Sequence, residues 1–224
     1  MAIRPLLLGH RGARADKSIP ENSLGSFDRA LAGGCDGFEF DVRLSADGLP
    51  VICHDPVFRG LEIARCSAEQ LALPLLGDVL RRYRKTAFLD IELKVTGLEA
   101  VTLDLLRVCP PAGGYVISSF LPEVLTKLHE LDGALSAGLI CETPAQFKLW
   151  PEVPLDYVIP HKSLATRSVI TEIQKAGKKV LVWTVNSTRD MKRFAGWDAD
   201  GIISDHPDKL IRAFGHGSDR LLRD

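Results

Sequence analysis

The sequence predicts an α/β fold in which eight parallel strands close into a (β/α)8 barrel. Short apolar, β-branched segments alternate along the chain with amphipathic segments whose apolar residues recur every three to four positions. Strands that alternate with helices in this way form right-handed crossovers and a parallel sheet. No GxGxxG or P-loop pattern follows a strand segment, so nothing favours the alternative, a doubly wound open sheet.

The first expected unit begins with the strand Leu6–His10. A helix follows, in which Leu24, Phe27 and Leu31 form one apolar face. The second expected strand is Gly37–Arg43. A strand, a helix and a second strand in this order make the first parallel crossover of the barrel.

The interval between the second and third strands is the longest, about 51 residues, and is too long for one helix and two loops. It contains an extra apolar piece, Val51–His54, which follows the turn-rich segment Ser45–Pro50. We therefore expect approximately residues 45–66 to fold back as a small insertion between strand 2 and helix 2 of the barrel.

Six further strands complete the barrel, and the later ones are evenly spaced. From the fifth strand onward each begins about 22 residues after the last, which is enough for one strand, one short helix and two loops. The third to eighth expected strands are Phe88–Lys94, Tyr115–Ser119, Leu135–Cys141, Tyr157–His161, Lys179–Val185 and Gly201–Asp205. Such barrels usually take about 250 residues, so 224 residues make a compact one.

Composition narrows the class of protein. No stretch rich in Pro, Gly and Ser divides the chain, so we expect one domain, 1–224, with a polar, frayed tail at 215–224. The 28 basic and 29 acidic residues balance, which argues against a nucleic-acid partner. No stretch reaches the roughly 18 apolar residues of a membrane span, and we expect no stable membrane association. Five cysteines without a CxxC pair are typical of a reducing compartment, so we expect a cytoplasmic protein; nothing indicates an oligomeric state.

Charged side chains gather where the first three strands end. Glu39 and Asp41 stand two residues apart on the second strand, and Glu92 and Lys94 do so on the third. Residues at i and i+2 of a strand point to the same face, so each pair projects together. His10 ends the first strand. In a barrel these positions meet at the C-terminal mouth, where such barrels keep their active sites.

The chemistry of these groups indicates a phosphate ester as substrate. Three carboxylates repel one another unless a cation lies between them, and an all-oxygen set selects Mg²⁺, Ca²⁺ or Mn²⁺. Arg11 and Lys94 would repel that cation unless an anion such as phosphate lies between the cation and the two side chains. His10 and His54 supply two groups that titrate near neutrality, one to take a proton and one to give it.

Each of these residues has an alternative role. Glu39 and Lys94 could form a salt bridge inside the barrel, and His54 could cap a turn. We expect Asp205, which precedes His-Pro, to be the N-cap of the last helix rather than a ligand. Two aromatic residues near strand ends could belong to the core or to a substrate platform: Phe120 and Trp183. The coincidence of charged groups at one end of three consecutive strands favours a site.

Residues 9–56 resemble the N-terminal signature of the glycerophosphodiester phosphodiesterase family. That signature has a His-Arg-Gly start, a Pro-Glu-Asn before a helix, a Glu-x-Asp-Val strand, and an Asp-Gly turn before Val-x-x-His-Asp. Later segments agree with it in the correct order: Asp90–Lys94, Ser118–Phe120, Val182–Asn186 and Gly201–Pro207. The resemblance therefore covers nearly the whole chain.

The resemblance implies a (β/α)8 barrel and a reaction. The reaction is metal-dependent hydrolysis of glycerophosphodiesters, such as glycerophosphocholine or glycerophosphoethanolamine, to sn-glycerol 3-phosphate and an alcohol, within glycerol and lipid metabolism. It implies one divalent cation, Mg²⁺ or Ca²⁺ with Mn²⁺ also possible, on Glu39, Asp41 and Glu92. The other implied roles are acid and base for His10 and His54, phosphate contacts for Arg11 and Lys94, a place near the phosphate for Asn22, and glycerol contacts for Phe120 and Trp183.

Two other functions fit the same motifs. A lysophospholipase D or sphingomyelinase D-like enzyme would keep the histidines and carboxylates but would need an apolar groove for acyl chains. A non-catalytic barrel that binds metal and phosphate would not need two proton-transfer groups. The segment Gly133–Ser168 carries little of the family pattern, and we expect it to decide the alcohol preference. Attack by water and attack by the glycerol hydroxyl, through a cyclic phosphate, both remain open.

Overall fold

The computed structural model describes residues 4–215. Eight parallel strands form a closed barrel, because β1 pairs with β11 on one side and with β2 on the other. In chain order the barrel strands are β1 (Leu6–His10), β2 (Gly37–Leu44), β6 (Phe88–Leu93), β7 (Tyr115–Ser119), β8 (Ala137–Cys141), β9 (Tyr157–Pro160), β10 (Lys179–Val182) and β11 (Gly201–Ser204). The predicted (β/α)8 fold is confirmed.

Some strand ends differ from the prediction. β10 ends at Val182 rather than Val185, although an isolated bridge still pairs Trp183 with His161. The Val185 N–H donates to the carbonyl of Ile203, so the chain stays beside β11 after it leaves the regular ladder. Residues between strand and helix are thereby free to line the mouth of the barrel.

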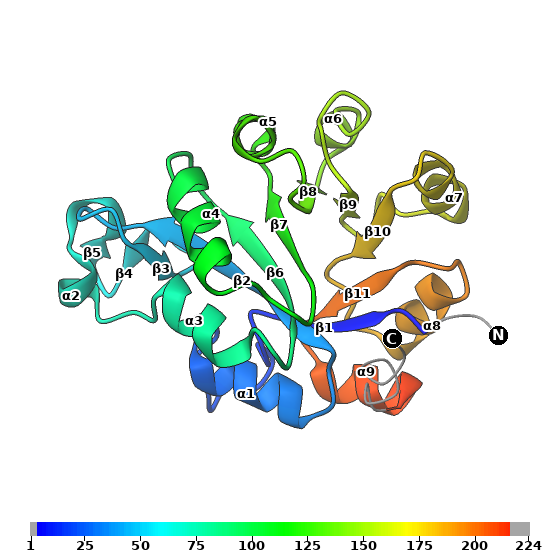
Figure 1. Ribbon diagram of the computed structural model, residues 1–224. Coiled ribbons are helices and arrows are strands. Elements are labelled where there is room, and N and C mark those ends of the chain that lie inside the picture. The colour runs from blue at the N-terminus through cyan, green and yellow to red at the C-terminus, as the bar shows by residue number, and fades with distance from the viewer. Residues whose placement is uncertain (1–3, 216–224) are drawn as a thin grey trace.

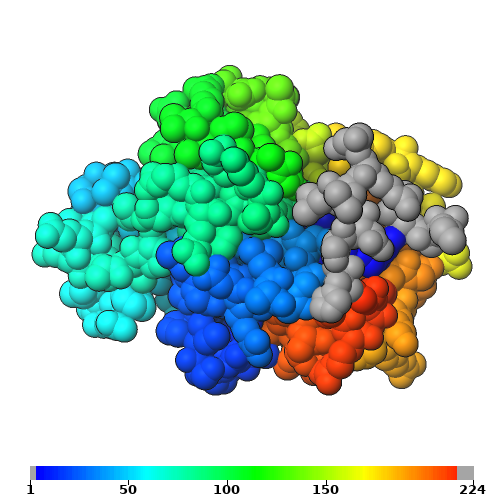
Figure 2. Space-filling view, turned by 60° about the horizontal axis from the view of Figure 1, so that its bottom comes forward, coloured from blue at the N-terminus to red at the C-terminus, as the bar shows by residue number. Residues whose placement is uncertain are grey.

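Helices surround the barrel (Figure 1). The barrel helices are α1 (Leu24–Ala32), α3 (Leu76–Tyr83), α4 (Glu99–Val108), α5 (Pro122–Leu131), α6 (Pro144–Phe147), α7 (Arg167–Lys175), α8 (Thr188–Ala195) and α9 (Pro207–Phe214). Side chains of Ser23, Thr166 and Ser187 accept the N–H three residues ahead and so begin α1, α7 and α8. The first and last helices lie side by side (Figures 1 and 2), as closure of the barrel requires.

Two apolar layers hold these elements together. The larger layer lies between strands and helices, where the rings of Phe27 and Phe38 stack 4.2 Å apart. The smaller layer fills the inside of the barrel with Leu8, Phe88, Val116, Ile140, Tyr157, Ile159, Leu181 and Ile203. Because side chains fill most of the interior, the open end of the barrel is the place where a polar site is expected.

A small insertion follows β2, at the left of Figure 1. It contains β3 (Pro50–Ile52), which runs antiparallel to β2, the hairpin β4 (Val57–Phe58) and β5 (Leu61–Glu62), the 3-10 turn η1 (Ile63–Arg65) and α2 (Ala68–Leu71). The insertion has its own apolar cluster, to which Ala68 and Leu71 belong. These contacts carry the insertion beyond residue 66, and α3 then resumes the barrel.

The tail expected at 215–224 lies outside the described residues from 216 onward. Among the helices of the described chain, none has the length and apolar character to cross a membrane.

Candidate active site

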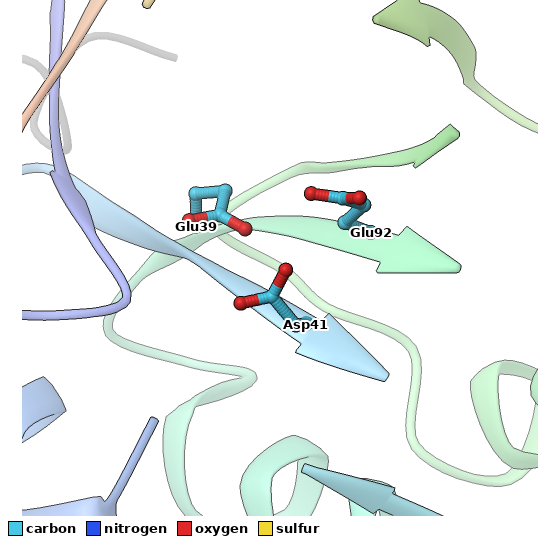
Figure 3. Close-up of side chains that lie close together, drawn as sticks. All are labelled: Glu39, Asp41 and Glu92. Atoms are coloured by element: carbon cyan, nitrogen blue, oxygen red, sulfur yellow. The ribbon is translucent and has the colours of Figure 1, made fainter. Parts of the chain in front are cut away.

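Three carboxylates meet at the C-terminal mouth of the barrel (Figure 3). β2 carries Glu39 and Asp41, and β6 carries Glu92, which is the register partner of Asp41. One oxygen from each carboxylate lies within 4.8 Å of the others. All three side chains are buried. The i, i+2 argument from the sequence thus places these side chains correctly.

The oxygens of this cluster fit a hard divalent cation. Glu39 Oε1 is buried without a hydrogen-bond partner in residues 4–215. Asp41 Oδ1 and Glu92 Oε1 contact the ammonium of Lys94 at 3.3 and 2.6 Å, but neither makes a hydrogen bond of normal geometry within that range. Unsatisfied, closely spaced carboxylate oxygens are the ligands that Mg²⁺ and Ca²⁺ prefer.

The protonation of the cluster agrees with that fit. Burial raises the pKa of Glu39 well above its usual value, and burial raises the pKa of Glu92 to about 8; the charge of Asp41 adds to both shifts. Burial acts in the same sense on Asp41, but Lys94 and Arg11 hold its pKa below the usual value. The metal-free cluster therefore retains protons that a bound cation would displace.

Two basic side chains border the carboxylates. Lys94 Nζ also lies 5.7 Å from the ring centroid of Phe120. The Arg11 guanidinium pairs with Glu21 at 2.6 Å and lies 3.1 Å from Asp41 Oδ2. The Arg11 backbone N–H donates to Glu39, at a left-handed φ of 51°. This arrangement gathers two cations beside the three carboxylates.

Asn22 lies under the cluster rather than in the mouth. Its Nδ2 donates to Asp41 Oδ2 at 2.8 Å, and its Oδ1 accepts from the Asp41 N–H. Asn22 is buried and does not line the cavity described below. It therefore braces the carboxylate of Asp41, and its predicted place near the phosphate stays a prediction.

His10 ends β1 next to Glu39, its register partner on β2. Its Nδ1 lies 2.7 Å from Asp205 Oδ1, and its Nε2 lies 3.7 Å from Glu39 Oε2. Burial lowers the pKa of His10, against the opposing hydrogen bond to Asp205. Burial also opposes ionisation of Asp205, but the hydrogen bond and charge of His10 bring the pKa of that carboxyl well below its usual value.

The predicted role of Asp205 as the N-cap of the last helix is wrong. His206 occupies the N-cap position of α9, without a capping side-chain hydrogen bond. β11 ends at Ser204 opposite Gly9 of β1, so Asp205 reaches the mouth beside His10. The Asp205 carboxylate therefore pairs with His10, which is distant in sequence, instead of capping the helix that follows it.

His54 approaches the same cavity from the loop after β3. Its Nδ1 lies 2.7 Å from Asp55 Oδ1, and its backbone carbonyl accepts from Arg43 Nε. The His54 side chain is 36% exposed, against 9% for His10. The insertion thus supplies the second histidine from a more open position.

These groups surround one cavity of about 290 Å³, a size suited to a small molecule. Phe120 and Trp183 form part of its wall, with ring centroids 5.6 Å apart and nearly perpendicular planes. The complete lining is His10, Arg11, Glu39, His54, Asp90, Glu92, Lys94, Phe120, Ile140, Glu142, Ile159, Trp183 and Ile203.

Sequence reasoning missed two of the polar lining residues. Asp90 stands two residues before Glu92 on β6, so the i, i+2 rule could have found it. Glu142 follows β8 in a segment without a motif, and no pattern in the sequence indicates it. Asn186 ends the family segment Val182–Asn186 but had no predicted role; in the structure its Nδ2 donates to Asp205 Oδ2.

Comparisons with known proteins all point to the same family. The model of the glycerophosphoryl diester phosphodiesterase family matches residues 10–71 and 111–209. A glycerophosphodiester phosphodiesterase of Caldanaerobacter subterraneus is 28% identical, with 96% of this chain and 100% of that protein covered. Another, from Bacillus altitudinis, is 26% identical over 92% of this chain and 96% of its own length.

Solved structures have the same fold. A phosphodiesterase of Oleispira antarctica, solved with the product sn-glycerol-3-phosphate, is 26% identical with a TM-score of 0.80, covering 94% of this chain and 96% of that one. A glycerophosphodiester phosphodiesterase of Thermotoga maritima also has a TM-score of 0.80, at 22% identity over 95% and 99% of the two chains. The second likeness supports the barrel alone.

Proposed function

Because the chain belongs to the glycerophosphoryl diester phosphodiesterase family, we propose that it hydrolyses small glycerophosphodiesters to sn-glycerol 3-phosphate and an alcohol. Glycerophosphocholine and glycerophosphoethanolamine are the substrates we expect. The observation that carries the proposal is one cavity lined by two histidines, two cationic side chains and carboxylates with unsatisfied oxygens. Those groups together meet the needs of phosphodiester cleavage.

Glu39, Asp41 and Glu92 would hold one divalent cation, Mg²⁺ or Ca²⁺, with Mn²⁺ also compatible with an oxygen site. When bound, such a cation withdraws charge from phosphoryl oxygens as a Lewis acid. The fit rests on the buried oxygens Glu39 Oε1, Asp41 Oδ1 and Glu92 Oε1, none of which makes a regular hydrogen bond within residues 4–215.

Arg11 and Lys94 would bind the phosphate. Both side chains line the cavity next to the carboxylates, so an anion bound there would lie beside two positive charges. A guanidinium can grip two phosphoryl oxygens at once, whereas an ammonium acts as a point charge. Donors in fixed positions oppose the charge that grows during attack, which is commonly the largest contribution in such sites.

His10 and His54 would move the two protons of the reaction. The oxygen of water forms a bond to phosphorus while the bond from phosphorus to the alcohol oxygen breaks. One imidazole accepts the proton that water loses, and the other donates a proton to the leaving oxygen. Each transfer contributes about 10²–10⁴ in rate. If the glycerol hydroxyl attacks first, the same two groups serve it and then water.

Phe120 and Trp183 would contact the carbon atoms of the substrate. Their rings offer an apolar wall opposite the charged side of the cavity, together with Ile140 and Ile159. Such a wall can hold a small polyol by its carbon face.

Release of sn-glycerol 3-phosphate from glycerophosphocholine tests the proposal. Activity should disappear with a chelator and return with Mg²⁺, Ca²⁺ or Mn²⁺. His10→Ala and His54→Ala should each lower kcat about 10²–10⁴-fold without unfolding the protein. Faster cleavage of lysophosphatidylcholine would favour the lipid phosphodiesterase instead. Full activity in both histidine variants, or no release of the product, would contradict the proposal.

A further inference from the structure

We propose that Asp205 is a positioning residue, which keeps the proton of neutral His10 on Nδ1 and presents Nε2 to the cavity. This inference rests on the proposed function, because it concerns a group that would transfer a proton there. Asp205 stands just after β11, whereas His10 ends β1, and the two strands are neighbours in the barrel. The closure of the barrel thus brings together residues from opposite ends of the chain.

The carboxylate of Asp205 is held from several sides. Its Oδ1 lies 2.7 Å from His10 Nδ1 and accepts from Arg14 Nη1 at 3.2 Å. Its Oδ2 accepts from Asn186 Nδ2 at 2.7 Å. Asn186 Oδ1 in turn accepts the backbone N–H of Asp205 at 3.0 Å and the hydroxyl of Ser204. Neither carboxylate oxygen can turn away from the ring without losing a partner.

The identity of the partner decides the tautomer. An ionised carboxylate only accepts hydrogen bonds, so the His10 nitrogen facing it must be the one that carries hydrogen. The other nitrogen, Nε2, then has a free lone pair in the neutral ring. Nε2 lies 3.7 Å from Glu39 Oε2, on the side of the metal-ligand carboxylates, and the ring lines the cavity. The reactive nitrogen is therefore aimed where the phosphate would bind.

The second histidine provides an internal comparison. His54 Nδ1 also faces a carboxylate, that of Asp55, at 2.7 Å. The side chain of Asp55 is 74% exposed, and its hydrogen bond within residues 4–215 is to His54. The side chain of Asp205 is 16% exposed and has three partners, His10, Arg14 and Asn186. A carboxylate in open water fixes its partner less firmly, because water competes for both groups. Orientation by a carboxylate should thus matter more for His10.

The test combines a spectrum of the unchanged protein with two matched variants. Nitrogen-15 NMR of the metal-free protein, with His10→Ala to assign the ring, should show His10 protonated at Nδ1 near neutral pH. Asp205→Asn should lower kcat for glycerophosphocholine by about 10²–10⁴-fold, since an amide can hold the wrong tautomer. Its KM should change less than about threefold, because binding is retained. Asp55→Asn should lower kcat by less than tenfold.

Each outcome decides the proposal. An Nε2-protonated His10 in the unchanged protein, or an Asp205→Asn variant with normal kcat, would overturn the positioning role while leaving the phosphodiesterase reaction intact. An unchanged protein that releases no sn-glycerol 3-phosphate would overturn the proposed function and this role with it. If Asp205→Asn unfolds, two measurements still decide the proposal: the spectrum of the unchanged protein, and kcat of Asn186→Ala, which lacks one hydrogen bond to the Asp205 carboxylate. A normal kcat in Asn186→Ala together with a proton on His10 Nε2 in the unchanged protein refutes the positioning role.

Discussion

Asp90, which lines the cavity, lets the size of a stability change be worked out from the structure. The side chain is fully buried; Ser118 Oγ donates to its Oδ1 at 2.5 Å, and its Oδ2 has no hydrogen-bond partner within residues 4–215. Burial raises the pKa of Asp90 to about 7, against the hydrogen bond from Ser118 and with a contribution from the charge of Asp41. We predict that Asp90→Asn stabilises the metal-free protein at alkaline pH.

The sign follows from proton binding. The folded protein keeps a proton on Asp90 between pH 4 and 7, whereas the unfolded chain releases it, so the free energy of unfolding falls as pH rises through this range. A shift of about three units at about 1.4 kcal/mol per unit costs at most about 4 kcal/mol at pH 8. At pH 5 only about one unit of that loss has accumulated. Asparagine keeps the shape but does not ionise, so its advantage should shrink by about 3 kcal/mol between pH 8 and pH 5.

Thermal and urea unfolding with a chelator present, followed by circular dichroism, measure this difference. At pH 8 we expect Tm of Asp90→Asn to exceed that of the unchanged protein by about 5–15 °C. Asp104→Asn, on the exposed face of α4, is the control and should shift little at either pH. An Asp90→Asn variant that is less stable at pH 8, or whose advantage is equal at both pH values, would refute the reasoning.

Three further measurements test other parts of the structure. Mg²⁺ or Ca²⁺ at 100 times its Kd should stabilise the fold by about 2.7 kcal/mol, and Asp41→Asn should remove that shift; an equal shift in the variant would place the ion elsewhere. Burial raises the pKa of the Cys35 and Cys141 thiols to about 12, so neither should react with a thiol reagent at pH 8 until urea unfolds the chain. Peptide mapping separates them from the partly exposed Cys66 and Cys109, and rapid labelling of Cys35 or Cys141 in the folded protein would contradict their burial. Trp183→Ala should raise KM for glycerophosphocholine up to about tenfold with a smaller effect on kcat, and an unchanged KM would remove the ring from the substrate wall.

The barrel and its acidic cluster follow from local rules. A barrel strand has a period of two, so Glu39 and Asp41 must share a face, and the parallel neighbour β6 places Glu92 beside Asp41. The first relation depends on residues close in sequence, and the second depends on the assumption that consecutive barrel strands are neighbours. The same rule would have added Asp90, had it been applied one step earlier along β6.

Asp205 shows why the remaining contacts of the site could not be predicted from the sequence. Its local sequence, an acidic residue before His-Pro, matches the start of a helix, and α9 does begin at Pro207. Its actual partner, His10, is 195 residues away. The hydrogen bond from Asn22 to Asp41 was equally unpredictable, because it is visible only in the folded chain. Hydrogen bonds between side chains that are distant in sequence depend on register and rotamer, which no single-sequence pattern encodes.

A crystal structure of the protein with Mn²⁺ and sn-glycerol 3-phosphate, with anomalous scattering recorded at the manganese edge, tests the central claim most directly. We predict one manganese peak among Glu39, Asp41 and Glu92, with the phosphate next to it and both imidazoles within reach. A manganese ion bound elsewhere, or a phosphate outside this cavity, would contradict the account.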